Sequence, residues 1–316
     1  MQNIEEKIRG MVVGSVVGDA LGMPLEFHPA RPLAGLVRDM EMGPLPAGTF
    51  TDDTEMALAL ADSLIAHSPL DGDDFTQRLL AWLQNRPADI GIHTANVLNR
   101  IASGVSWQQA AEQVQAEDPE NAGNGSLMRA WPVAAMHHAN LGLLIGESRL
   151  QSQLTHVHPD CVNACVFVNL LLSDLIHRDI GKTTDAALRE SIASSLTKVS
   201  LGREFELVVN LAPVRQRSSL RNSGWVRHTL ESACWAVLTT HSFEEALISA
   251  VNLGNDADTA GAVTGAIAGA LYGFDAIPDR WKDAIHGEYP LRSGRIWFLQ
   301  DFVNLADEMM DASKSN

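Results

Sequence analysis

The chain has 316 residues, a hydrophobic fraction of 46% and a formal net charge of −16 at pH 7. So acidic a surface disfavours nonspecific binding to nucleic acid or membranes, although one local site can still hold a phosphate-bearing ligand. The hydrophobic fraction suffices for a large core and no low-complexity linker divides the chain, so we expect a single domain over residues 1–316.

Three cysteines and no N-terminal apolar signal segment are typical of the reducing cytoplasm, and we expect a cytoplasmic location. The most apolar runs, around 11–17 and 260–274, are shorter than the ~20 residues that a membrane helix needs. We therefore expect no membrane insertion, and we expect a monomer.

Helical periodicity recurs along the chain, whereas no run shows the alternation of a strand between turn residues. The prolines and glycines of the loops gather at 29–48, 118–126 and 156–160. This pattern predicts an all-α fold. The expected helices are 4–21, 54–66, 75–84, 92–103, 107–115, 161–177, 185–196, 226–239, 243–252 and 260–272.

The first and last of these helices carry a glycine at every fourth position, from Gly10 to Gly22 and from Gly261 to Gly273. Each helical glycine costs ~0.5–1 kcal/mol relative to alanine. Close approach of another helix along a stripe without side chains would compensate this cost. We expect both helices at the centre of the bundle, packed either against each other or each against another element.

Two adjacent aspartates stand at the head of the second helix, in "TDDTE" at residues 51–55. Taken alone, the stretch is typical of a capping box, in which Asp52 caps the helix and Glu55 reaches back to it. Carboxylates in the first turn also suit the helix dipole.

A second segment, "GNDADTAGAVTGAIAG" at 254–269, again places two close carboxylates and a threonine at a helix start. If the two segments met, four carboxylates and two hydroxyls would form the oxygen shell that hard divalent cations prefer. Four converging carboxylates require protons or metal, and two divalent cations would balance their charge fully. An EF-hand is excluded, because Ala260 and Ile267 stand where its loop needs ligands.

Three further stretches could carry chemistry. "AGNGSLMR", 122–129, is a glycine-rich turn whose amides could bind a phosphate, and Arg129 would add a positive charge. "GDALGMPLEF", 18–27, contains Glu26 just past the helix end, which is either a candidate acid or base or a solvated loop glutamate. A zinc site at His156, His158, Cys161 and Cys165 lacks the usual spacing, so we expect both cysteines in the core.

Together these motifs resemble the ADP-ribosylglycohydrolase family over roughly residues 7–290. The resemblance implies a single-domain orthogonal helical bundle with a dinuclear Mg²⁺ or Mn²⁺ site in a central cleft. The matching segments, in chain order, are "GSVVGDALGMPLEF", "GTFTDDTEMAL", "DIGIHT", "NGSLMR", "THVHP", "GWVRHTLESACWA" and "GNDADTAGAVTGAIAGALYG".

Roles for individual residues follow from the resemblance. Glu26 and Asp89 would approach the reacting sugar as catalytic groups. Trp225 stands where many relatives carry tyrosine, so it would stack on adenine or line the cleft. The metal ligands would be Thr51, Asp52, Asp53, Asp256, Asp258 and Thr259, and the remaining substrate contacts Asn124, Gly125, Ser126 and His158.

The function implied by the resemblance is removal of ADP-ribose from a modified protein, with N-linked arginine as the expected linkage and ADP-ribose as the product. Serine, nucleobase and other ADP-ribose linkages remain open. One rival is a class I isoprenoid synthase, but Val263 stands where its second motif needs glutamate, and aromatic residues are only 6%. A protein that binds ADP-ribose without cleaving it is the other rival.

Overall fold

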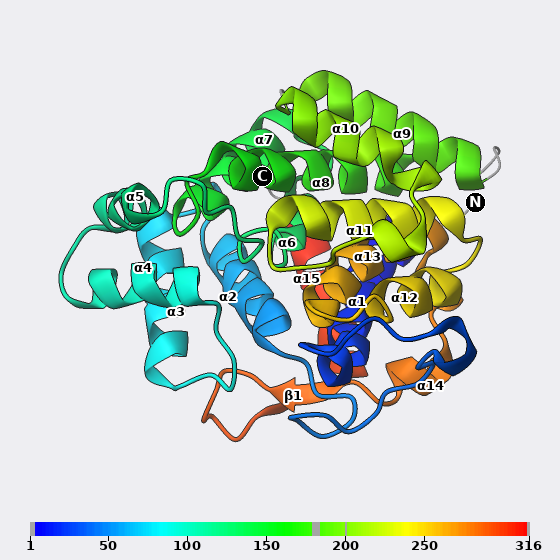
Figure 1. Ribbon diagram of the computed structural model, residues 1–316. Coiled ribbons are helices and arrows are strands. Elements are labelled where there is room, and N and C mark those ends of the chain that lie inside the picture. Colours follow the sequence, from blue (N-terminus) through cyan, green and yellow to red (C-terminus); the bar gives the residue numbers. More distant parts are fainter. Residues whose placement is uncertain (1–3, 179–183, 200, 315–316) are drawn as a thin grey trace.

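The computed structural model describes residues 4–178, 184–199 and 201–314, and these residues are mostly helical (Figure 1). The expectation of an all-α fold is confirmed. The helices are α1 (Ile4–Gly22), α2 (Asp52–Ala66), α3 (Gly72–Gln84), α4 (Ile92–Ala102), α5 (Trp107–Glu117), α6 (Trp131–His137), α7 (Leu141–Gln153), α8 (Pro159–His177), α9 (Thr184–Lys198), α10 (Arg203–Leu211), α11 (Val226–Thr239), α12 (Phe243–Val251), α13 (Ala257–Tyr272), α14 (Asp279–Lys282) and α15 (Leu299–Ser313).

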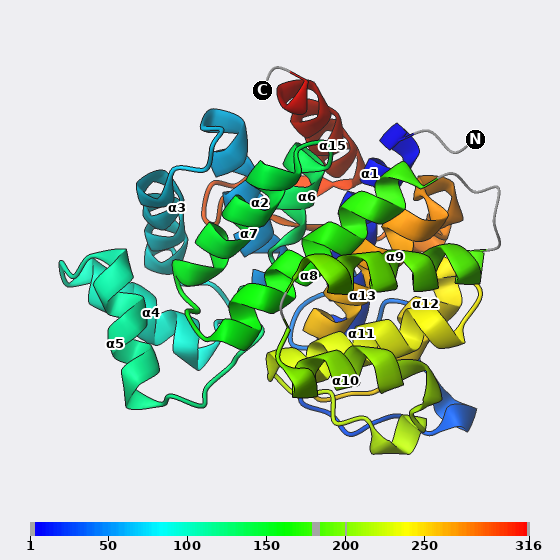
Figure 2. The ribbon, with the colours of Figure 1, turned by 90° about the horizontal axis from the view of Figure 1, so that it is seen from above.

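Helices α1 and α13 lie side by side in the middle of the fold and meet along their glycine faces (Figures 1 and 2). A methyl group at Gly14 would lie closer than 3.0 Å to the carbonyl oxygen of Gly265. One at Gly18 would lie even closer to the carbonyl oxygen of Gly261, at 2.0 Å. The two ladders therefore face each other in antiparallel order, and close backbone packing compensates the low helix propensity of glycine.

The other helices surround this pair. Helices α8, α11 and α12 pack against α13, and α15 packs against α1. Helix α2 starts beside the central pair and packs against α3 and α6. Both views place α3, α4 and α5 on the side of α2 that is remote from α1 and α13 (Figures 1 and 2). The starts of α2 and α13 thus come close to each other near the centre of the molecule.

Some elements were not expected from periodicity. One is a short antiparallel hairpin of β1 (His286–Glu288) and β2 (Ile296–Phe298), with Gly287 opposite Trp297. Five helices, α6, α7, α10, α14 and α15, were also missed. Helix α7 shows why, because most of its buried residues are polar, namely Glu147, Ser148, Gln151 and Ser152. A buried polar stripe gives no apolar periodicity to detect.

Two helical segments are long and apolar enough to cross a membrane by length and composition alone. They are Ile4–Leu25, of 22 residues, and Pro159–His177, of 19 residues. The most apolar window of each is mostly buried inside the protein, 94% in the first and 78% in the second. The expectation that the apolar run near the N-terminus is too short was therefore wrong. Its burial is that of a core helix, and the absence of membrane insertion stays a prediction.

Candidate active site

The start of α2 is held by a carboxylate from the central helix α1. Asp19 is fully buried, and its oxygens accept hydrogen bonds from the amides and the hydroxyls of Thr51 and Thr54 at 2.6–3.1 Å. These bonds satisfy amides that the first turn of a helix otherwise leaves without a partner. They also fix the direction in which Asp52 and Asp53 leave that turn.

The capping box expected at this helix start is wrong. Helix α2 begins at Asp52, and Thr51 before it makes no side-chain cap. Glu55 turns away and accepts a hydrogen bond from Trp82 Nε1 at 2.6 Å. Burial raises the pKa of Glu55 to about 7. Because Asp19 supplies the cap from another helix, the first-turn aspartates are free to face the cleft.

The second acidic segment lies at the start of α13 and meets the first. Thr259 Oγ1 donates a hydrogen bond to Asp53 Oδ2 at 3.2 Å, across 206 positions of sequence. Asp258 is only 2% exposed, and its Oδ1 accepts the amide of Thr259 at 2.9 Å. Asn124 donates from its side chain to Asp256. The two acidic helix starts therefore form one continuous wall.

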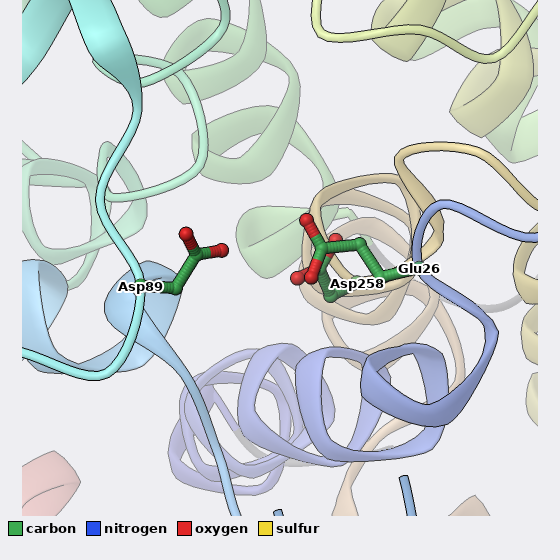
Figure 3. A group of neighbouring side chains, drawn as sticks. All are labelled: Glu26, Asp89 and Asp258. Atoms are coloured by element: carbon green, nitrogen blue, oxygen red, sulfur yellow. The ribbon is translucent and has the colours of Figure 1, made fainter. Parts of the chain in front are cut away.

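This wall belongs to a cleft of about 740 Å³. Oxygens of Glu26, Asp89 and Asp258 all lie within 4.8 Å of one another. Figure 3 shows Asp89 facing the other two carboxylates from a separate segment of the chain. The predicted site residues that line the cleft are Glu26, Asp52, Asp53, Asp89, Asn124, Gly125, Asp256, Asp258 and Thr259.

The electrostatics of the cleft are those of crowded, poorly solvated carboxylates. Burial, and next the charges of Asp89 and Asp256, raise the pKa of Glu26 to about 8. Burial also raises the pKa of Asp258 well above its ordinary value, and the charge of Asp53 raises it further. Among the described residues, no lysine or arginine lines the cleft. The cleft therefore needs protons or bound cations to compensate its charge.

The donor set fits hard divalent cations. The acidic residues and Thr259 offer only oxygen atoms, which Mg²⁺ and Mn²⁺ prefer. Asp53 Oδ1 is buried and has no hydrogen-bond partner in the part of the chain that the structure describes. This is a costly state for a carboxylate oxygen, and a neighbouring cation would relieve it. The acidic cluster can therefore hold a metal ion, while the number and identity of the ions stay predictions.

These pKa values predict that, without divalent cations, the protein loses stability as the pH rises. Glu26 keeps its proton in the folded state up to about pH 8, whereas its ordinary value is 4.5. Between these values the folded state binds more protons than the unfolded state, so the free energy of unfolding falls with rising pH. The melting temperature in a chelator should drop by several degrees across this window.

The same series with Mg²⁺ or Mn²⁺ should show a higher melting temperature at the alkaline end, because a cation favours the ionised carboxylates. The variant Glu26→Gln should flatten the slope measured in chelator. A melting temperature that changes neither with pH nor with added cations would contradict this account of the cleft.

The turn expected to hold a diphosphate is divided between the cleft and the core. Asn124 and Gly125 line the cleft. The hydroxyl of Ser126 points into the core and lies 2.9 Å from Ser152 Oγ. The amides of Gly125 and Ser126 have no backbone acceptor among the described residues, but only Gly125 lines the cleft. The contact between this turn and a diphosphate stays a prediction.

Arg129 does not add a positive charge to the cleft, so that expectation was wrong. Its side chain is fully buried behind the turn. The guanidinium donates to the Gln151 carbonyl at 2.9 Å and to Thr155 Oγ1 at 2.8 Å. Arg129 therefore supports the cleft wall from behind and is out of reach of a phosphate.

The histidines that line the cleft are His93 and His156, whereas His158 does not. His158 lies at the start of α8, where its Nδ1 accepts the amide of Asp160 at 3.1 Å. The rings of His93 and His156 lie 4.6 Å apart, and burial lowers the pKa of both, so they are neutral near pH 7. His93 belongs to the motif "DIGIHT" and His156 to "THVHP". Spacing alone does not tell whether His156 or His158 of the second motif faces the cleft. A substrate contact by His158 stays a prediction.

The remaining predicted residues lie beside the cleft. Thr51 is buried and is not among the residues that line the cleft, and its hydroxyl donates to Asp19. Trp225 is 37% exposed and lines a shallow extension of about 310 Å³ that shares Asn121, Gly123 and Gly224 with the cleft. The guanidinium of Arg227 lies over the Trp225 ring, 5.1 Å from its centroid. Trp225 could therefore reach only the part of a ligand that extends out of the cleft.

Known proteins resemble this chain over most of its length. It is 36% identical over 293 residues to the "ADP-ribosylarginine hydrolase Tri1" of Serratia proteamaculans, covering 89% of this chain and 75% of that protein. It is 34% identical to the ADP-ribosyl-(dinitrogen reductase) glycohydrolase of Rhodospirillum rubrum, covering 88% and 90%. It is 25% identical to the human "ADP-ribosylhydrolase ARH3", covering 89% of each chain.

A solved structure supports the same assignment. The "ADP-ribosylglycohydrolase-related protein complex" superposes with a TM-score of 0.78 at 31% identity, covering 99% of this chain and all of that one. The model of the ADP-ribosylglycohydrolase family matches residues 1–316. The chain therefore belongs to the ADP-ribosylglycohydrolase family, and it is a glycohydrolase enzyme.

Proposed function

We propose that this enzyme removes ADP-ribose from ADP-ribosylated arginine on proteins, with two divalent cations, Mg²⁺ or Mn²⁺, bound in the acidic cleft. The observation that carries the proposal is the charge of the cleft. Six carboxylates line it, and no lysine or arginine among the described residues does so. A ribosylated guanidinium is a cation, and a cleft lined by carboxylates attracts it. The named activity of the Serratia relative supports the same linkage.

Cations are needed for the other half of the substrate. The diphosphate of ADP-ribose is anionic, so six carboxylates would repel it from the cleft unless cations compensate their charge. Thr51 and Thr259 would complete the ligand set, because each hydroxyl donates its hydrogen to a carboxylate and keeps lone pairs for a cation. When bound, the cations supply positive charge that orients the ribose hydroxyls.

We assign the diphosphate of the substrate to the turn from Asn124 to Ser126. The amide of Gly125, which has no backbone acceptor among the described residues, would donate a hydrogen bond to a phosphate oxygen. The side chain of Asn124 is held by hydrogen bonds to Thr229 and Asp256, so the turn is fixed before a ligand arrives. A fixed turn loses little conformational entropy on binding.

The carboxylates of Glu26 and Asp89 perform the proton transfer. Cleavage of the bond at ribose C1 passes through an oxocarbenium-like sugar. The protonated arginine leaves as neutral guanidine, and a water molecule adds to C1. The proton of that water passes to Glu26 or Asp89 and then to the departing guanidine. The proximity of the two carboxylates to Asp258 supports a transfer beside the proposed cation site.

A serine linkage is the second candidate. An alkoxide leaves poorly, so cleavage of an O-glycoside needs a general acid. Glu26 suits that role, because burial and neighbouring charges raise its pKa to about 8 and leave it protonated near neutral pH. The choice between the two linkages therefore depends on whether Glu26 is ionised when cations are bound.

A panel of arginine-, serine- and nucleobase-linked ADP-ribose substrates tests the proposal. The purified protein should release ADP-ribose from the arginine-linked member with the highest kcat/KM. Faster cleavage of the serine-linked member would transfer the assignment to the second candidate. Binding of ADP-ribose, seen as a raised melting temperature, without cleavage of any member would indicate a binding protein.

Removing divalent cations should abolish release of ADP-ribose, and adding back Mg²⁺ or Mn²⁺ should restore it. The physical reason is that uncompensated carboxylates repel the diphosphate and leave the ribose unoriented. The measurement is turnover in a chelator, before and after dialysis against each cation. Full turnover in chelator would remove cations from the mechanism.

A further inference from the structure

We propose that Phe27 and Ile92 form an apolar lip on the cleft that binds the acceptor side of the substrate, namely the aliphatic stem of the modified arginine and the apolar atoms beside it. The inference rests on the proposed function, because it assumes an arginine-linked substrate. It adds two specificity-determining residues that neither carry charge nor take part in the chemistry.

Phe27 is held outward by an unusual backbone conformation. Its φ is +59°, in the left-handed region that bulky residues avoid. Two backbone hydrogen bonds impose it, from the Phe27 amide to the Asn255 carbonyl at 2.6 Å and from the Asn255 amide to the His28 carbonyl at 2.7 Å. The side chain is 80% exposed and lines the cleft. A large aromatic ring is thus kept in water at the cleft, directly after Glu26.

Ile92 lies close in sequence to the other proposed catalytic carboxylate. It is the first residue of α4, three positions after Asp89. Its side chain is 82% exposed and lines the same cleft. Asp89 Oδ1 accepts the amide of Ile90 at 2.7 Å, which fixes the short connection between the carboxylate and the helix. Both lip residues therefore stand on the segments that carry the proposed proton-transfer groups.

The position of the lip indicates which part of the substrate it contacts. The reacting bond must lie near Glu26 and Asp89, which face each other from separate segments (Figure 3). The diphosphate is assigned to the turn at Asn124 and Gly125. The acceptor atoms on the other side of the departing nitrogen are therefore expected to contact Phe27 and Ile92. In an arginine these atoms are three methylene groups, which gain free energy by leaving water against apolar side chains.

The test compares two substrates with the same scissile bond. One is an ADP-ribosylated arginine peptide, and the other is ADP-ribosylated guanidine, which has no aliphatic stem. The variants are Phe27→Asn, since asparagine tolerates a left-handed φ, and Ile92→Ala. For the peptide, KM should rise about 5- to 10-fold with kcat unchanged, as expected when contact with a few methylene groups is lost. For ADP-ribosylated guanidine, both constants should stay within about 2-fold.

Leu33→Ala is the matched control, because Leu33 lies on the same loop, is 75% exposed and is not among the residues that line the cleft. Leu33→Ala should leave kcat and KM unchanged for both substrates. Phe27→Leu should recover part of the peptide affinity that Phe27→Asn loses. Equal losses on both substrates would overturn the lip, since Phe27 would then act only by shaping the Glu26 loop. Unchanged constants on both would overturn it as well. If the wild-type enzyme cleaves neither substrate but cleaves a serine-linked one, the proposed function fails, and the lip fails with it.

Discussion

Asp258→Asn is expected to lower the turnover of an ADP-ribosylated arginine substrate by about 10²- to 10³-fold while leaving the fold intact. Asp258 is almost fully buried at the start of α13 and has an oxygen within 4.8 Å of both Glu26 and Asp89. Asparagine has the same shape but carries no charge, so it weakens any cation site at this point. Its effect on turnover should therefore far exceed its effect on structure.

The stability of the same variant should change in the opposite direction. Burial and neighbouring carboxylates raise the pKa of Asp258, which means that its ionised form destabilises the cleft when cations are absent. In chelator at neutral or alkaline pH, the variant should melt at the same temperature as the wild type or higher. With Mn²⁺ it should gain less stability than the wild type, and less Mn²⁺ should bind in a titration.

The exposed Asp283 provides the matched control, because Asp283→Asn removes one negative charge from a residue that does not line the cleft. That variant should keep wild-type turnover and Mn²⁺ binding, and both variants should keep the wild-type helical circular dichroism. Full turnover in Asp258→Asn would remove Asp258 from the site.

Gly265→Ala is expected to destabilise the protein by about 3 kcal/mol or more, or to prevent folding. A Cβ at this position would overlap the carbonyl group of Gly14 in the facing helix. The neighbouring atoms belong to backbone, and no flexible side chain can move aside. Relief therefore requires α1 and α13 to separate along their length, which loosens the centre of the fold and the start of α13.

Gly146→Ala on α7 is the control, because a Cβ there meets nothing within 4 Å. Since alanine favours a helix more than glycine does, this variant should be neutral or more stable by about 0.5–1 kcal/mol. Urea unfolding followed by circular dichroism measures both free energies. Similar values for the two variants would show that the glycine ladders are not needed for close packing.

Sequence patterns predicted the helices with the clearest local signal. The helix expected over 226–239 is observed as Val226–Thr239, and that expected over 92–103 as Ile92–Ala102. Helix α15 was missed although Phe302, Leu305 and Met309 repeat at helical spacing, so its signal was present in the sequence. Helix α7 was missed for a physical reason, because its buried stripe is largely polar.

The candidate site was predicted in part. Two acidic helix starts with neighbouring threonines pointed to an oxygen-rich cluster, and the hydrogen bond from Thr259 to Asp53 shows that they meet. Asp19 was missed as the group that holds the start of α2, because it reads only as one carboxylate within a glycine-rich helix. His156 was passed over for His158, since two residues of spacing do not show which side chain turns inward.

By itself, the sequence determined the main helices, the two glycine ladders and the two acidic helix starts, because each depends on residues within a few turns of one another. Only the tertiary structure decided that the ladders face each other, that Asp19 caps α2 and that Arg129 is buried behind the cleft. The contacts of Asp19 with Thr51 and of Thr259 with Asp53 span 32 and 206 positions. Such contacts depend on how whole helices cross, and spacing along the chain does not specify that crossing.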